Sequence, residues 1–185
     1  MNASLHNEDF FAGIGRIADG SVDLVVADPP DGPGKDYGND SDHLSGAAYL
    51  DFSRRWVEAV LPKLKSSTRS IFIGKKWLEV GYNPKDIWSV SRLHRQDPER
   101  EAHPTQKPLE IVERMVLASC PPGDMVLDPF MGSGTVAVAA LRHGRRITGF
   151  EMNPGYLAIA QSRAACFPDV AQPHAANAHR PTVVI

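Results

Sequence analysis

Cysteine, long apolar runs and an excess of charge of either sign are all scarce in this chain. It has 2 cysteines among 185 residues, Cys120 and Cys166, and they lack the spacing of a metal site or a disulfide framework. We therefore predict two reduced thiols and no metal. No apolar run reaches the roughly 18 residues of a membrane-spanning helix. The net charge of −2 excludes a general electrostatic attraction to DNA, which leaves only local basic patches for such contacts.

The length favours one domain. We expect a single domain over residues 1–167, with a short connecting region at 75–102 and a loose tail at 168–185 that is rich in Ala, His and Pro. The first residues lack a basic-then-apolar signal pattern, so a cytoplasmic protein is expected. The candidate basic patches contain Lys75, Lys76, Arg92, His94, Arg95 and Arg100.

Short apolar segments alternate with segments of helical periodicity along the chain. Strands are predicted at 22–27, 71–73, 125–128 and 146–151, helices at 47–64, 108–119, 133–143 and 154–166, and a short strand followed by a short helix at 4–14. This alternation predicts an α/β fold in which a mostly parallel sheet has helices on both faces. The strand 125–128 should lie beside 22–27.

The most informative segment runs from Val126 to Thr135. Asp128 ends an apolar strand, and Gly132 and Gly134 lead into a helix. Glycines allow the backbone to approach a ligand closely, and a helix start offers free N–H groups. After the next strand comes Glu151, where a carboxylate can accept both hydroxyls of a ribose. The combination predicts a nucleotide-type cofactor site, although the glycine spacing alone would be weak support.

Two other motifs are rich in proline. The apolar strand 22–27 ends in Asp28-Pro29-Pro30, where two prolines make a rigid corner that stops regular pairing. His103-Pro-Thr-Gln-Lys-Pro108 precedes the helix predicted from 108.

Together, the three motifs resemble the β group of S-adenosylmethionine-dependent DNA amino-methyltransferases of the Asp-Pro-Pro-Tyr type, found in restriction-modification systems and phages. The resemblance covers roughly residues 4–74 and 83–164, including the loop 34–42. It implies a three-layer, Rossmann-like methyltransferase fold in circularly permuted order. It also implies S-adenosylmethionine as cofactor, DNA as partner and transfer of a methyl group to the exocyclic nitrogen of adenine. Family members are often dimeric, so a homodimer is a further expectation.

The resemblance also implies roles for individual residues. Asp28 and the Pro29 carbonyl would accept the two N–H bonds of the target amine and so free its lone pair. Thr105 to Lys107 would contact the methionine end of the cofactor, and Glu151 its ribose. The catalytic set is Asp28, Pro29, Pro30 and Asp31, and the cofactor set is Asp9, Thr105, Gln106, Lys107, Asp128, Pro129, Phe130, Gly132, Ser133, Gly134, Thr135, Glu151 and Asn153. Two alternatives stay open: Phe130 as a core residue, and Asn153 as the cap of the helix from 154.

The chain departs from the family pattern in two places. Asp31 stands where the family has an aromatic residue that stacks on the flipped base. We hypothesise that this change impairs the chemical step, with Tyr37 as a possible substitute ring. A long stretch that includes the target-recognition region also has no counterpart between Gly74 and Asn83. Its loss would leave an incomplete sheet with an unpaired edge beside 70–74.

Other functions are less well supported. An N4-cytosine DNA methyltransferase and a non-catalytic, cofactor-binding remnant both remain alternatives. A dinucleotide-dependent oxidoreductase would need a third glycine after Gly134, which is absent. Proteins that methylate protein glutamine share this chemistry but usually have Asn at the position of Asp28.

Overall fold

The computed structural model describes residues 2–30, 46–66, 71–73 and 90–167. Five strands form one sheet in the order β1-β5-β4-β2-β3, and every neighbouring pair is parallel. The strands are β1 (Ala3–His6), β2 (Leu24–Ala27), β3 (Ile71–Ile73), β4 (Met125–Asp128) and β5 (Arg146–Phe150). The predicted parallel sheet is confirmed, and β4 lies beside β2 with Leu24 opposite Val126.

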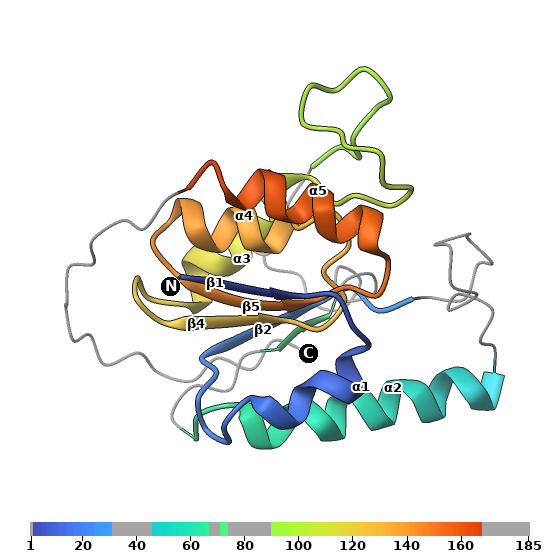
Figure 1. Cartoon of the computed structure of the whole chain (residues 1–185), viewed down its shortest axis with the longest axis vertical. Helices are drawn as coiled ribbons and strands as arrows, with labels where there is room; N and C mark the ends of the chain where they lie inside the picture. Colours follow the sequence, from blue (N-terminus) through green and yellow to red (C-terminus); the bar gives the residue numbers. More distant parts are fainter. Residues whose placement is uncertain (1, 31–45, 67–70, 74–89, 168–185) are drawn as a thin grey trace, which may run out of the picture.

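Helices cover both faces of this sheet (Figure 1). On one face lie α3 (Leu109–Ser119), α4 (Thr135–Arg142) and α5 (Pro154–Ala164); on the other lie α1 (Phe10–Gly13) and α2 (Gly46–Val60). The predicted three-layer α/β architecture is therefore confirmed. Short 3₁₀ turns, Ile14–Arg16 and Leu61–Lys63, follow α1 and α2. The helix predicted over 47–64 ends earlier, as the chain enters the turn that contains Pro62.

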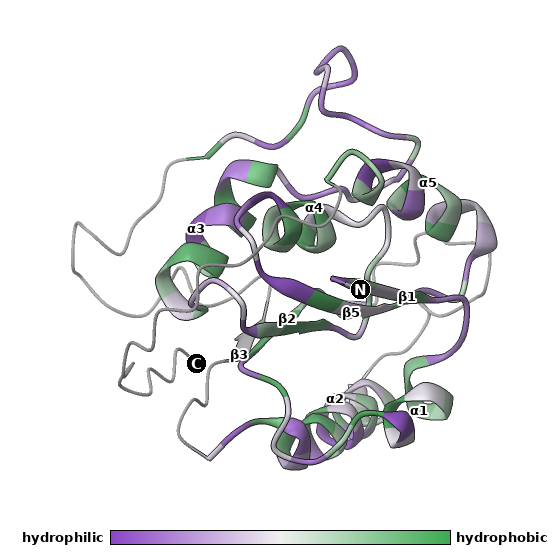
Figure 2. Ribbon diagram, turned by 60° about the vertical axis from the view of Figure 1, so that its left-hand side comes forward, coloured by the Kyte–Doolittle hydropathy of each residue, from purple (hydrophilic) through white to green (hydrophobic). Residues whose placement is uncertain are grey.

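The core divides into two layers because side chains alternate along each strand. Leu24 and Val26 of β2 pack in the cluster with α3, α4 and α5, whereas Val25 and Ala27 pack in the cluster with α1 and α2. Helix α4 lies between α3 and α5, and its residues 135–141 are all buried. Figure 2 shows the resulting apolar character of α4 and β2. This rigid centre fixes the strand ends that carry the candidate site.

Within the described residues, β3 is an outer strand of the sheet and pairs with β2 alone. Asp31, Tyr37, Lys75, Lys76 and the tail 168–185 lie outside the described residues. Over the part of the chain that the structure covers, no helix has the length and apolar character needed to cross a membrane. Cys120 and Cys166 are both free, as predicted. Burial raises the pKa of the Cys120 thiol to about 12, so that this thiol is un-ionised at neutral pH.

Candidate functional site

Three carboxylates follow or end adjacent strands of the sheet. Asp128 is the last residue of β4, Asp28 follows β2, and Glu151 follows β5. Because β2, β4 and β5 are parallel neighbours, these acids share the carboxyl edge of the sheet. This edge is where open α/β sheets bind ligands.

Asp128 is the most deeply placed of the three acids. It is buried, and its Oδ1 accepts a hydrogen bond of 3.1 Å from the Phe130 N–H. Burial raises the pKa of Asp128 well above its ordinary value; the Phe130 N–H opposes this rise, and the charges of Asp28 and Glu151 add to it. Asp128 therefore fixes the start of the glycine turn and is buried at the carboxyl edge of the sheet.

Glu151 is tied to the glycine turn. Its Oε2 accepts the Gly132 N–H and its Oε1 accepts the Asn153 N–H, each at 2.8 Å. Burial raises the pKa of Glu151, and the N–H groups of Asn153 and Gly132 counteract that rise. The Met152 N–H also bonds this carboxylate. A carboxylate has about four lone-pair sites, so these three bonds fix its orientation and leave capacity for a ligand hydroxyl.

The turn after β4 depends on its glycines. Gly132 and Gly134 have φ of 53° and 79°, a left-handed conformation that costs other residues energy. A Cβ on Gly134 would lie 2.7 Å from the Ala160 Cβ on α5, and one on Gly132 would lie 2.9 Å from His103 Nε2. The turn is therefore enclosed by α5 and by the segment that carries His103.

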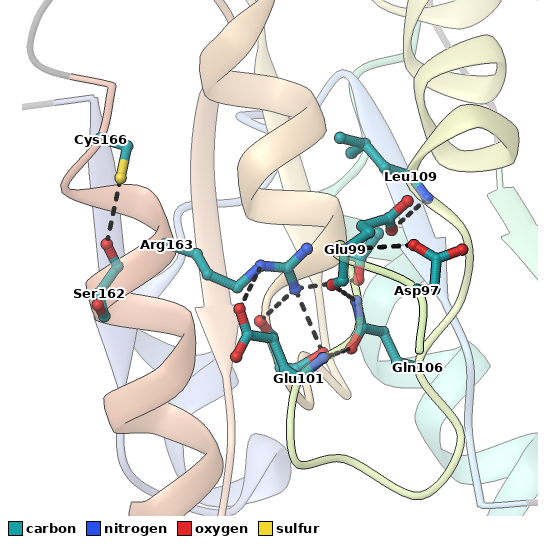
Figure 3. Close-up of polar contacts among 10 residues, drawn as sticks. Asp97, Glu99, Glu101, Gln106, Leu109, Ser162, Arg163 and Cys166 are labelled. Atoms are coloured by element: carbon teal, nitrogen blue, oxygen red, sulfur yellow. Dashed lines mark hydrogen bonds and ion pairs between the residues drawn. The ribbon is translucent and has the colours of Figure 1, made fainter. Parts of the chain in front are cut away.

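Arg163 of α5 fastens the same turn (Figure 3). One of its terminal nitrogens donates to the Ser133 carbonyl at 2.7 Å and lies 3.3 Å from the Thr135 hydroxyl. Its Nε lies 4.0 Å from a Glu101 carboxylate oxygen. The sequence pattern does not single out Arg163, because an arginine in the last turn of a helix is usually an ordinary surface residue.

The side chain of Gln106 is used inside its own loop (Figure 3). Its oxygen accepts the Glu101 N–H at 2.7 Å and its nitrogen donates to the Glu99 carbonyl at 2.8 Å. The Glu99 carboxylate accepts the Leu109 N–H at 2.7 Å, at the start of α3. These bonds fix the loop ahead of α3, a role that differs from the cofactor contact that the resemblance implies.

Lys107 reaches the catalytic corner. Its Nζ lies 2.6 Å from Asp28 Oδ2, although the two residues are far apart in sequence. The motif that begins at His103 thus contacts both the Asp28 corner and the glycine turn.

His103 is a second residue whose role the sequence did not predict. Its ring lies 4.5 Å from that of Tyr156, in an edge-to-face arrangement, and it covers Gly132. Burial, with the charges of Lys107, Arg100 and Arg163, lowers the pKa of His103 to about 4. The imidazole is therefore neutral at physiological pH.

Three further predicted residues have identifiable local roles. Asp9 caps α1 by accepting the Phe11 and Ala12 N–H groups at 2.8 and 3.3 Å. Asn153 caps α5 by accepting the Gly155 N–H at 2.8 Å, which is the alternative proposed for it. Phe130 packs at the sheet face, where its ring centroid lies 6.0, 5.8 and 5.8 Å from those of Phe10, Phe52 and Trp56. These contacts leave their cofactor roles as predictions. Among the described residues, no three His, Cys, Asp or Glu side chains form a group that could hold a metal ion.

The fold and the strand-end turn define a methyltransferase-type α/β domain. A DNA methylase family model matches residues 73–162, just under half of the chain, so this part of the chain is similar to that family. Type II methyltransferase M.HpaI from Haemophilus parainfluenzae is 29% identical, over 80% of this chain and 69% of that protein. DNA adenine methyltransferase YhdJ from Escherichia coli is 38% identical, over 57% of this chain and 38% of its own length. Type II methyltransferase M2.DpnII from Streptococcus pneumoniae is 46% identical, over 48% of this chain and 33% of its own length.

Solved structures share the fold. The N4-cytosine-specific PvuII DNA methyltransferase superposes with a TM-score of 0.69 at 19% identity, over 88% of this chain and 86% of that chain. A putative DNA modification methylase from Thermus thermophilus, complexed with S-adenosyl-L-methionine, gives a TM-score of 0.61 at 23% identity over 98% of both chains. The described chain therefore has the methyltransferase architecture, while it spans only about a third of the length of relatives such as M2.DpnII.

Proposed function

We propose that this protein transfers a methyl group from S-adenosylmethionine to the exocyclic amine of adenine in DNA. The observation that supports this most is the placement of the Asp28 corner on the strand beside β4, whose glycine turn is bonded to Glu151. A nucleophile-binding corner and a nucleotide-binding turn then share one edge of the sheet. The likeness to YhdJ, named a DNA adenine methyltransferase, favours adenine over cytosine.

The residues at this edge fit S-adenosylmethionine. When bound, that cofactor supplies an electrophilic methyl group on a positively charged sulfur. Glu151 is oriented to accept a ribose hydroxyl, and the positive-φ glycines let the turn fold closely against His103 and Ala160 at this edge. We assign the remaining members of the predicted cofactor set, apart from Lys107, to the same site as proposals.

The chain's own contribution to the reaction is positioning. Asp28 and the Pro29 carbonyl accept hydrogen bonds from the two N–H groups of the adenine amine. These hydrogen bonds favour a pyramidal nitrogen whose lone pair points at the methyl group. Pro29 and Pro30 restrict the backbone of this corner. Holding the reacting atoms in line can lower the reaction barrier by about 7–11 kcal/mol in favourable cases.

The test is methyl transfer from labelled S-adenosylmethionine to unmethylated DNA, followed by nucleoside analysis of the product. We expect N6-methyladenine with the wild-type protein and none with Asp28→Ala. N4-methylcytosine would support the alternative target base. Saturable cofactor binding without any product would identify a non-catalytic remnant.

Asp31 offers a second arm of the same test. It lies outside the described residues, and in the sequence it replaces the aromatic residue that stacks on a flipped base. Stacking is worth about 1–3 kcal/mol per base. We expect Asp31→Tyr to raise the rate of methyl transfer, with Asp31→Asn as the control that removes the charge without adding a ring. An unchanged rate in Asp31→Tyr would contradict the impairment hypothesis.

The extent and setting of the protein are further proposals. The alignment with M.HpaI spans 218 residues, more than the 185 of this chain, which supports the shortened connecting region at 75–102 within one domain over 1–167. We place the protein in the cytoplasm with DNA as its partner. The outer strand β3 offers an edge for a homodimer. Light scattering after size-exclusion chromatography tests that assembly, and a monomeric mass would exclude it.

A further inference from the structure

We propose that Lys107 is a positioning residue for the carboxylate of Asp28, and is not a ligand of the cofactor's methionine end. The inference rests on the proposed function and assigns a separate role within it. It would make the loop ahead of α3 part of the machinery that holds the target base.

The contact itself is specific. Lys107 Nζ and Asp28 Oδ2 are 2.6 Å apart, and the two side chains are 39% and 35% exposed. A pair that is partly shielded from water interacts more strongly than a more exposed pair such as Arg54 with Asp51, whose side chains are 67% and 52% exposed. The pair also joins two loops at the ligand edge, whereas Arg54 and Asp51 are neighbours on one helix.

The backbone around Lys107 is fixed from both sides. Before it, the Gln106 side chain is bonded to the main chain of Glu99 and Glu101. After it, Pro108 has φ of −59° and the Leu109 N–H is bonded to the Glu99 carboxylate. Figure 3 shows these bonds converging on one loop. An ammonium group carried by such an anchored segment can orient its partner with less loss of chain freedom than one on a loose loop.

The contact has a consequence for the geometry of Asp28. Pro29 and Pro30 restrict the backbone that follows Asp28, while Lys107 restrains its side chain through Oδ2. A carboxylate bonded at one oxygen still has lone pairs on the other, so Oδ1 can accept an N–H of the target amine. Lys107 thus aims Asp28 without itself touching the reacting atoms.

Cofactor affinity and turnover separate the two roles. In Lys107→Met we expect the Kd for S-adenosylmethionine, measured by calorimetry, to stay within about twofold of wild type. The kcat at saturating cofactor should fall by about tenfold or more, because displacement by about 1 Å can cost about a hundredfold. Lys107→Arg, which keeps the charge, should recover part of kcat. A tenfold weaker cofactor affinity with unchanged kcat at saturation would overturn the proposal.

The dependence on Asp28 gives a second test. Asp28→Asn will leave little activity, and Lys107→Met should cause no further loss in that background if Lys107 acts through Asp28. A further tenfold loss in the double variant would show an independent role and overturn the proposal.

A wild type that shows no methyl transfer would refute the proposed function, so the ion pair needs a readout of its own. Lysine ammonium signals in nitrogen-15 NMR report paired side chains. We expect one signal that is present in wild type and missing in both Lys107→Met and Asp28→Asn. Its persistence unchanged in Asp28→Asn, or its absence from the wild-type spectrum, would show that the pair does not form.

Discussion

The three acids at the ligand edge differ in what they bond. Asp128 accepts an N–H of its own turn, Glu151 accepts N–H groups from the glycine turn after β4 and from the segment after β5, and Asp28 pairs with Lys107. The sequence pattern located all three, because an acid that directly follows an apolar strand is a local feature. It did not predict the partners of Gln106 and Lys107. Those depend on how the loop folds back on α3, for which the motif contains no periodic signal.

Glu151 is expected to control cofactor affinity. In Glu151→Gln the negative charge is lost. The amide has one acceptor oxygen, so either the Gly132 N–H or the Asn153 N–H would face the amide nitrogen and lose its acceptor. Hydrogen bonds to charged groups are worth about 1.5–3 kcal/mol, so the Kd for S-adenosylmethionine should rise about 10–100-fold. Isothermal titration calorimetry measures this change. Glu58→Gln, on the exposed face of α2, is the control and should bind as wild type does. Equal affinities in all three proteins would exclude the assigned role.

His103 predicts a pH dependence of stability. Its pKa falls from 6.5 to about 4 in the folded chain, so between these values the unfolded chain holds a proton that the folded chain does not. Stability should therefore fall as the pH drops from about 6.5 to 4, by about 2 kcal/mol after allowance for partial exposure. Urea unfolding at a series of pH values gives this slope.

His103→Phe keeps a ring but removes the titrating group. The slope of its unfolding free energy against pH should therefore correspond to about one bound proton fewer than in wild type. His94→Gln, which removes an exposed imidazole, serves as the matched control and should keep the wild-type slope. Parallel curves for wild type and His103→Phe would contradict the prediction.

The helices and strands agree with the sequence pattern to within four residues at each end, and β3 and β4 have the predicted bounds. Apolar spacing decides α3 and α5, which bury residues at helical intervals, whereas α4 is buried all round. The closeness of α5 to the glycine turn was not predictable. It depends on the small side chain of Ala160 and on Arg163. A single sequence gives no information on how a helix packs against a distant turn.

This close approach leads to a prediction about Gly134. Gly20 and Gly134 both have positive φ, but a Cβ on Gly20 would meet no atom within 4 Å. Gly20→Ala should therefore cost only the backbone term, about 1–2 kcal/mol. Gly134→Ala should cost an additional amount of about 1–3 kcal/mol from crowding against α5. Urea denaturation of the two variants provides the comparison, and equal losses would show that the turn can move away from Ala160.

At the scale of the whole molecule, the sheet interleaves the two halves of the chain. β4 and β5 lie between β1 and β2, so three of the four strand pairings involve the C-terminal half. Strand order was predictable only for β4 beside β2, from the resemblance and from the shared ligand edge. The place of β1 at the outer side of β5 had no signal in the sequence, since β1 is four residues long and only partly buried.

Interleaving predicts that the two halves unfold together. Loss of β4 and β5 would leave β1 without a neighbour and β2 with β3 alone. Urea unfolding followed by far-ultraviolet circular dichroism and by tryptophan fluorescence should therefore give coincident transitions. Two separate midpoints would show that one half is stable without the other.

The same strand order has a consequence during synthesis. The partner of β1 is β5, whose residues Ile147 to Phe150 are translated long after Ala3 to His6. At about 5–20 residues per second, β1 waits on the order of ten seconds for its neighbour. During that interval the apolar strand β2 also lacks β4, so the nascent chain presents an open edge on the ribosome. Completion of the sheet therefore waits for the synthesis of β5, and chaperone binding to the segment that carries β1 and β2 would protect it until then.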